Sequence, residues 1–217
     1  MTDLLIKGLL DTLTIVFMST LFSFIGGFPL GVLLVIWKKE GIAPWVIGEK
    51  ILGSLVNVIR SIPFIILMIA LFPITRLIVG RGYGVNASIV ALVIGAIPFV
   101  ARLVESALEE VDDGLIKAAI TMGATPWQIV TKVYLIESIP SLIRSVSLTM
   151  ITLVGYAAMA GAVGGGGLGD IAIRYGLHRY QTDIMLITIV MMVILVQLIQ
   201  NIFHFLAVSL DRRRITN

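Results

Sequence analysis

The sequence predicts an all-α integral membrane protein with five transmembrane helices. Hydrophobic residues make up 58% of its 217 residues, charged residues make up 13%, and the mean hydropathy is +1.05. Soluble domains do not have this composition. Five apolar segments are near the ~20 residues that cross a bilayer as a helix. We therefore expect a single transmembrane domain over residues 1–217, with spans near 9–37, 51–74, 86–104, 145–168 and 184–210.

The first apolar segment, 9–37, is expected to be a retained helix and not a cleaved signal peptide. Asp3 and Asp11 stand where a signal peptide has basic residues, and the apolar run continues past Phe28 and Leu30. Both features differ from the short apolar region of a secretory signal.

The second segment, 51–74, is interrupted by Asn57 and Arg60. A charged side chain within a span reaches toward the interface or faces other helices, and we expect one of these for Arg60. Ser61 with Pro63, and Pro98 in the third segment, predict kinks. Such kinks either shape a cavity or are static bends.

The distribution of Lys and Arg predicts the orientation. Five spans with the N-terminus outside leave few basic residues on the outer side, as the positive-inside rule requires. The C-terminus and the segment 112–135 are then cytoplasmic. The inner set is Lys38, Lys39, Lys50, Arg60, Arg102, Lys117, Lys132, Arg144, Arg212, Arg213 and Arg214, and the outer set is Lys7, Arg76, Arg81, Arg174 and Arg179.

The segment 112–135 is too short and too charged to cross a bilayer, yet too apolar for an ordinary loop. Asp112 can cap one helix, Gly123 can end it in a left-handed turn, and Thr125 with Pro126 can begin a second helix. A helix that is apolar on nearly all sides is expected to be buried on nearly all sides. We therefore expect a partner protein here. The alternative is a helix that lies on lipid headgroups or packs beneath the membrane helices of its own chain.

Several kinds of chemistry lack their residues in this chain. No lysine is followed by Ser or Thr, so there is no Walker A loop and any ATPase must be a separate chain. His178 and His204 are the only histidines, they lie far apart, and there is no cysteine, so we expect no metal site. The carboxylates from Glu105 to Asp113 lie beyond the third apolar segment, and Asp170 and Asp183 border the last outer loop. Many ion-driven carriers instead place carboxylates at mid-membrane. We expect no catalytic or cofactor site, and no nucleic-acid partner.

The stretch VGGGGLGD contains the G-x-G-x-x-G spacing at Gly164, Gly166 and Gly169. No strand–turn–helix unit precedes it, so a dinucleotide site is not expected. Gly161, Gly165 and Gly169 also form small-xxx-small pairs, which allow close helix packing in lipid. Close packing is the default interpretation, and the alternative is a breakable helix end that opens an outer vestibule.

The segment 112–135 resembles the EAA signature of bacterial ABC importer permeases, which reads E-A-A, three residues, G, nine residues, I-x-L-P. Two positions depart from it: Lys117 replaces the Glu and Ile136 replaces the Pro, so the polar contacts of that Glu cannot be carried over. The positions that fit in register, with Val in place of Ile, are Ala118, Ala119, Gly123, Val133 and Leu135.

Three longer stretches are similar to the permeases of bacterial methionine ABC importers. They are NVIRSIPFIILMIALFPITRLIVG, IPFVARLVESALEEVDDGLIKAAITMGATP and TLVGYAAMAGAVGGGGLGDIAIRYG. The similarity extends roughly from the first span to Leu210.

This resemblance implies a type I ABC importer permease fold and a homodimer in the bacterial cytoplasmic membrane. Each copy would present a coupling helix to one of two cytoplasmic subunits that use ATP and Mg. An extracytoplasmic substrate-binding protein, lipid-anchored or periplasmic, would deliver methionine for transport by alternating access. Two alternatives remain at this point: a permease for another small amino acid or peptide-like solute, and an ATP-independent channel or secondary carrier.

Within this scheme two groups of site residues are expected. Tyr156 and Met159 lie three residues apart on the fourth segment and are candidates for the pore lining or gate. Plain packing is the alternative for Met159. The residues expected to contact the ATPase are Leu115, Ile116, Ala118, Ala119, Gly123 and Thr125.

Overall fold

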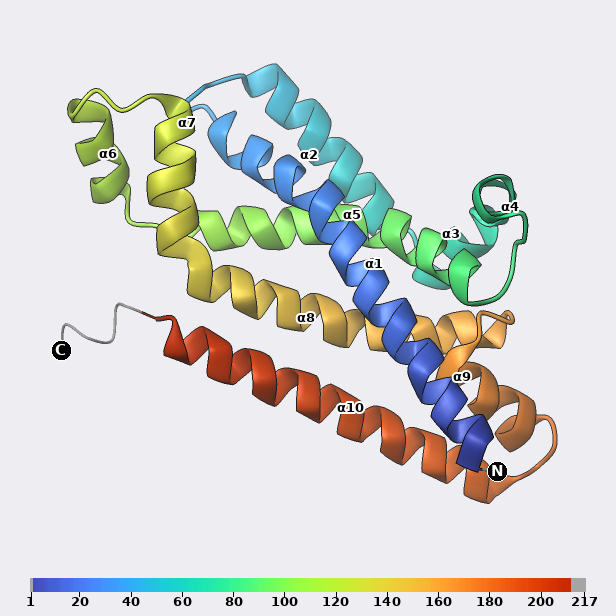
Figure 1. Ribbon diagram of the computed structural model, residues 1–217. Helices are drawn as coiled ribbons and strands as arrows, with labels where there is room; N and C mark the ends of the chain where they lie inside the picture. Colours follow the sequence, from blue (N-terminus) through green and yellow to red (C-terminus); the bar gives the residue numbers. More distant parts are fainter. Residues whose placement is uncertain (1, 212–217) are drawn as a thin grey trace.

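The computed structural model describes residues 2–211, and helices dominate this part of the chain (Figure 1). No strand occurs among these residues, which confirms the predicted all-α class. Arg212, Arg213 and Arg214, which entered the orientation prediction, lie outside the described residues. The elements are α1 Thr2–Ile36, α2 Val46–Arg60, α3 Phe64–Ala70, α4 Phe72–Val79, α5 Val85–Glu109, α6 Asp113–Thr121, α7 Pro126–Ile129, the π-helical turn η1 Val130–Tyr134, α8 Leu135–Ala162, α9 Gly167–Ile171, the π-helical turn η2 Ala172–Leu177 and α10 Thr182–Ser209.

Four segments are long and apolar enough to cross a membrane, and a bent pair of helices makes up to five. The bent pair is α2 and α3, which meet at 98°. The predicted second span, 51–74, is therefore divided between α2 and α3 at Ser61–Pro63, where a kink was expected, and its last residues belong to α4. The break has a local cause, because Pro63 lacks an N–H and disfavours a helical conformation at Ile62.

Two other spans are longer than the sequence predicts. α5 continues to Glu109, so Glu105 and Glu109 lie on its last turns and not beyond it. The fourth span begins well before residue 145, because α7, η1 and α8 follow one another without a break over residues 126–162. The second helix of the predicted cytoplasmic pair is thus continuous with a membrane span.

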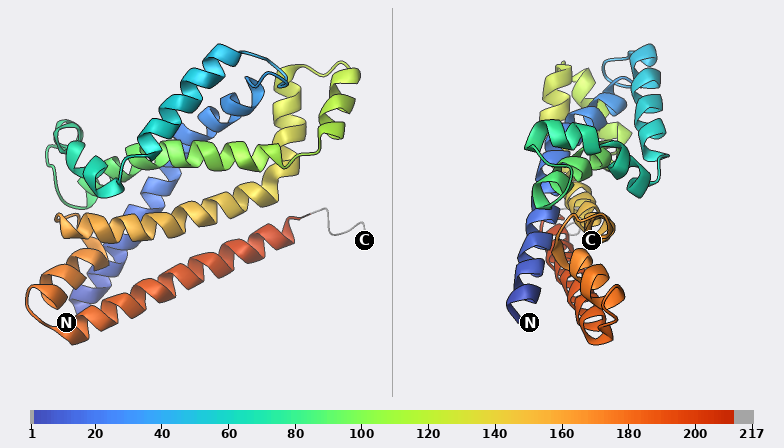
Figure 2. Two further views of the ribbon diagram at one scale, coloured as in Figure 1. Left: turned by 180° about the vertical axis from the view of Figure 1, so that it is seen from behind. Right: turned by 90° about the vertical axis from the view of Figure 1, so that its right-hand side faces the viewer.

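The two ends of the molecule carry different elements (Figure 2). α6 and α7 lie at one end, while α4, α9 and the N-terminal start of α1 lie toward the other. The long helices α1, α5, α8 and α10 connect these ends. Their outward faces carry many exposed large apolar side chains, as a protein surrounded by lipid or by a second subunit requires.

The most extensive contact between two helices is formed by α1 and α5. A Cβ atom at Gly31 would lie 2.6 Å from the backbone oxygen of Ala101, and one at Gly27 would lie 2.7 Å from that of Ile97. Only glycine fits against a backbone atom at this separation. The glycine pair, four residues apart, therefore sets the distance between the two helices in the way typical of membrane proteins.

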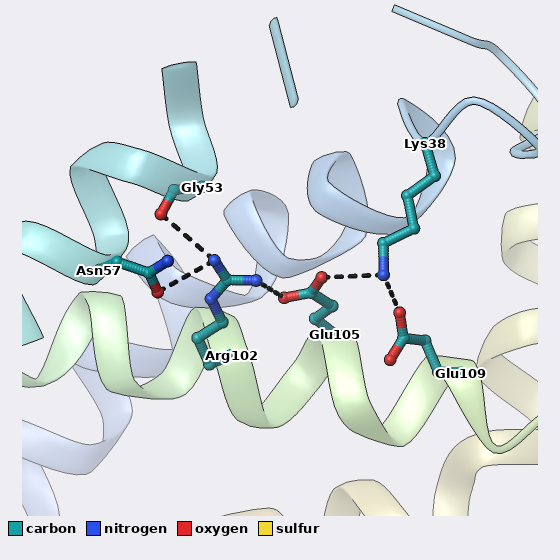
Figure 3. A network of polar contacts seen from close by, with 6 residues as sticks. All are labelled: Lys38, Gly53, Asn57, Arg102, Glu105 and Glu109. Carbon is teal, nitrogen blue, oxygen red and sulfur yellow. Dashed lines mark hydrogen bonds and ion pairs between the residues drawn. The ribbon is translucent and has the colours of Figure 1, made fainter. Parts of the chain in front are cut away.

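A polar network joins α5 to α2 (Figure 3). The Arg102 guanidinium donates through Nη1 to Glu105 Oε2 at 2.5 Å. Its Nη2 donates to Asn57 Oδ1 at 3.0 Å and to the backbone oxygen of Gly53 at 3.2 Å. The Glu105 side chain is only 6% exposed, so the positive charge of Arg102 compensates a carboxylate that would otherwise be buried without a partner.

The same network reaches the end of α1 through Lys38. Its Nζ lies 3.1 Å from Glu105 Oε1 and also pairs with Glu109. Burial lowers the pKa of Lys38, but the hydrogen bonds to Glu109 and Glu105 outweigh this effect and raise the pKa above its ordinary value. Lys38 is therefore charged at neutral pH. Its stabilising contribution is lost only as the pH rises through that elevated pKa.

We predict that Glu105→Gln destabilises the fold. The substitution keeps the shape of the side chain but removes the charge that Arg102 and Lys38 share. The free energy of unfolding, measured by denaturation of the purified chain in detergent, should fall by about 1–3 kcal/mol. Lys39→Gln, which changes an exposed charge next to the network, is the matched control. Equal losses in the two variants would contradict the role of the network.

Candidate functional site

α6 and α7 form a helix–turn–helix whose ends are capped as the sequence predicts. The Asp112 side chain accepts a hydrogen bond from the Gly114 N–H at 2.7 Å. The Thr125 hydroxyl accepts from the Gln128 N–H at 3.3 Å, and the Gln128 side chain accepts from the Thr125 N–H at 2.8 Å. This reciprocal pair is a capping box, and it fixes where α7 begins.

Gly123 closes the turn between the two helices with a φ of 78°. No atom lies within 4 Å of the position that a Cβ would occupy, so crowding is not the reason for glycine here. The reason is the left-handed backbone conformation, which side chains disfavour and which ends α6. The Ala124 N–H donates back to the Ala119 oxygen at 3.1 Å and completes the turn.

α6 has an inner and an outer face. Ile116 is 9% exposed and packs into a cluster with Val35, Leu108 and Ile129, while Ala119 packs against the same cluster. Large apolar side chains on the outer face remain free of the rest of the chain. We call this outer region the α6–α7 surface; it consists of Leu115, Ala118, Ile120, Met122 and Trp127.

The residues expected to contact an ATPase fall into two groups, those exposed on or beside the α6–α7 surface and those facing the interior. Leu115 and Ala118 lie on the α6–α7 surface, and the exposed Gly123 and Thr125 lie in the turn beside it. Ile116 and Ala119 turn toward the interior and hold α6 in place. Lys117 and Ile136, the two departures from the EAA pattern, are exposed.

Sequence reasoning did not select Met122 and Trp127, whose exposed fractions are 87% and 75%. The available signal was their size, because two large apolar residues flank a glycine turn between two short helices. Exposed side chains of this kind mark contact surfaces more strongly than small residues do.

The candidate gate residues on α8 have different surroundings. The Tyr156 ring stacks on Phe64 of α3, with centroids 4.2 Å apart and planes 2° apart. Met159 is 48% exposed and points out of the chain. It shares its face of α8 with Thr152 and Gly155, and no atom lies within 4 Å of a Cβ at Gly155. This face is exposed at Gly155 and Met159 and partly covered at Thr152.

The glycine-rich segment shows the close packing that was the default interpretation. A Cβ at Gly161 would collide with the backbone nitrogen of Asp170, and one at Gly169 would lie 2.5 Å from the Cα of Ala158. α9 therefore folds back directly onto α8. The Leu168 N–H donates to the Thr12 hydroxyl at 2.8 Å and ties this end to α1. Within residues 2–211, no cluster of three or more His, Cys, Asp or Glu residues could hold a metal ion.

Comparison with known proteins identifies close relatives. The chain is 53% identical over 212 residues to the probable D-methionine transport system permease protein MetI of Vibrio cholerae serotype O1, and the match covers 98% of this chain and 94% of the relative. It is 49% identical over 158 residues to the D-methionine transport system permease protein MetI of Escherichia coli strain K12, with 73% of each chain covered.

Among solved structures, the fold is similar to an inward-facing conformation of the MetNI methionine ABC transporter. The TM-score is 0.96 with 46% sequence identity, and the match covers 98% of both chains. Residues 27–216 match the family described as the binding-protein-dependent transport system inner membrane component. The matches to the Vibrio cholerae relative and to the MetNI structure each cover 98% of the chain. The chain belongs to the family of binding-protein-dependent transport system inner membrane components.

Proposed function

We propose that this chain is the permease subunit of an ATP-driven methionine importer in the bacterial cytoplasmic membrane. The similarity to the MetNI transporter over 98% of both chains is the observation that carries the proposal. Relatives described as D-methionine permeases supply the substrate. The chain is a transport subunit and not an enzyme. In this proposal ATP and Mg are used by two cytoplasmic partner subunits, and an extracytoplasmic binding protein delivers methionine to a permease homodimer.

The α6–α7 surface is the proposed contact with the ATP-binding subunit. It is apolar and exposed, while Ile116 anchors α6 to the membrane helices from the other side. α7 continues into α8 through η1, so a displacement of this surface is passed to the helix that carries Met159. Closure of the ATPase pair would thus rock α8 of both copies between inward- and outward-facing arrangements.

The same proposal places α6 and α7 in the cytoplasm and the N-terminus outside. Lys38 and Lys50 lie in the loop and the first turns next to this end, as the positive-inside rule expects. We predict that Gly82→Cys, in the loop between α4 and α5, reacts with a membrane-impermeant thiol reagent from outside intact cells. Lys39→Cys, at the other end, should react only after the cells are opened. The reverse pattern would invert the orientation.

A transport assay tests the main proposal. The permease, its ATP-binding subunit and its binding protein are reconstituted in liposomes, and uptake is measured for methionine and a panel of other amino acids and small peptides. ATP-dependent uptake of methionine is expected. Preference for another solute would support the first alternative, and uptake by the permease alone, driven by an ion gradient, would support a secondary carrier.

Two substitutions in the same assay test the coupling surface. Gly123→Val forces a β-branched residue into a left-handed conformation, which costs about 1–2 kcal/mol locally and displaces α7. Met122→Glu leaves the turn intact but places a charge in the apolar surface. Both should lower ATPase binding and methionine uptake at least tenfold while membrane insertion persists. Thr121→Ala, on an exposed neighbour, is the control. Normal binding and uptake in both variants would refute the proposed contact.

We also propose that Met159 narrows the pathway between the two copies of α8. Met159→Ala should assemble with the ATPase yet leak small solutes or hydrolyse ATP without matched uptake. Met150→Ala removes the same side chain from a packed position of α8, so it should lower stability without a leak. Cysteines at position 159 of both copies should cross-link in the resting state. A variant that stays coupled and never cross-links would show that Met159 is a packing residue.

A further inference from the structure

Arg60, in the last turn of α2, lies on the same side of that helix as its buried residues. It follows the buried residues Gly53 and Val56 by seven and four positions, so it continues their face toward α5. The opposite face is a stripe of apolar side chains with exposed fractions between 38% and 65%. These residues are Ile51, Leu55, Val58 and Ile62. Arg60 itself is exposed, so much of its side chain is not covered by residues 2–211.

Counted from Lys50, at the expected edge of the second apolar segment, Arg60 would lie deep in the membrane. Ten residues separate it from Lys50, which lies in the first turns of the helix. At 1.5 Å per residue this corresponds to about 15 Å, half of a hydrocarbon layer of about 30 Å. A charge at this depth is costly unless it is paired or reaches water.

No ion pair or side-chain hydrogen bond joins Arg60 to any of residues 2–211. Arg102, which contacts the same face of α2, differs from Arg60 because its guanidinium has hydrogen-bond partners within the chain. It binds Glu105, Asn57 and the Gly53 oxygen. Asn57, one turn before Arg60, is thereby already engaged. The positive charge of Arg60 has no counter-charge within the described chain.

The chain next to Arg60 is irregular as well as exposed. α2 ends there, Ser61 and Pro63 are exposed, and α3 departs at 98°. Non-helical backbone occurs at membrane depth only where protein or a water-filled cavity surrounds it. Phe64, directly after the break, stacks on Tyr156, three residues before Met159. The break thus adjoins the part of α8 that we propose as pathway lining.

We propose that Arg60 binds the carboxylate of the transported amino acid as it passes through the membrane. A guanidinium can hold a carboxylate through two parallel hydrogen bonds. Such a partner offsets part of the cost of removing the carboxylate from bulk water, and Arg60 gains a counter-charge that residues 2–211 do not supply. The inference rests on the proposed function, and it assigns to α2 a specificity residue separate from the gate on α8.

The test uses the complete reconstituted complex with methionine. Arg60→Gln should lower ATP-driven methionine uptake at least tenfold, while assembly and the ATPase activity stimulated by the methionine-loaded binding protein stay within twofold of the original. Arg60→Lys, which keeps the charge, should retain at least a third of the uptake. Arg76→Gln, an exposed arginine on α4, is the control and should transport normally.

The absence of cysteine allows a second measurement that does not depend on transport rates. Ser61→Cys, with Arg60 intact, should react with a charged, water-soluble thiol reagent during turnover, and methionine should slow this reaction. Absence of reaction in every nucleotide state would show that the break is dry and would overturn the proposal.

The outcomes separate this inference from the proposed function. If the unaltered complex shows no ATP-driven methionine uptake, the proposed function fails. If the unaltered complex transports methionine and Arg60→Gln transports it equally well, only the role of Arg60 fails. If Arg60→Gln and Arg60→Lys both lose assembly, Arg60 pairs with a carboxylate of the second copy and is a structural residue, which also overturns the inference.

Discussion

The close approach of α1 to α5 is the contact on which the arrangement of the rest depends. Gly27 and Gly31 let the two backbones meet without side chains between them. In lipid there is little hydrophobic gain from bringing helices together, so close packing must supply the association energy. This approach brings Lys38 at the end of α1 beside Glu105 and Glu109 on α5. It also forms the cluster of Val35 and Leu108 against which Ile116 packs. The α6–α7 surface therefore takes its position from a glycine contact in the membrane.

The α6–α7 surface is connected to the membrane helices in two different ways. Toward α5, α6 is joined by a short loop and held by apolar contacts of Ile116. Toward α8, the chain continues as helix from Pro126 without an intervening loop. Under the proposed function, a push on α6 and α7 would reach α8 through this continuous helix. The Arg102 network joins α5 to α2.

Local chemistry explains what could be predicted from the sequence. Asp112, Gly123 and Thr125 act through their own backbone neighbours, so their roles in the turn could be inferred without knowledge of the fold. The inward face of α6 could not, because a helix that is apolar on all sides gives no sign that Ile116 turns inward while Leu115 turns outward.

The end of α5 was placed too early for a related reason. In the sequence, a charged residue was taken as the end of an apolar segment. In the structure, the charge of Glu105 is compensated by Arg102, one turn away on α5, and by Lys38, which follows α1. The kink at Ser61 and Pro63 was expected, but its angle depends on how Phe64 meets Tyr156 on a helix almost a hundred residues away.

The contrast between Arg60 and Arg102 shows why burial and partners, and not hydropathy, distinguish a structural charge from a functional one. Both interrupt apolar segments, and both were counted on the inner side by the charge rule. Arg102 donates hydrogen bonds to a carboxylate, a side-chain amide and a backbone oxygen. These donors are therefore not free to bind a solute. Arg60 is held by nothing in the described chain and stands beside a break in the helix. For the proposed binding of a substrate carboxylate, Arg60 is the more suitable of the two, since no residue of 2–211 already occupies its guanidinium.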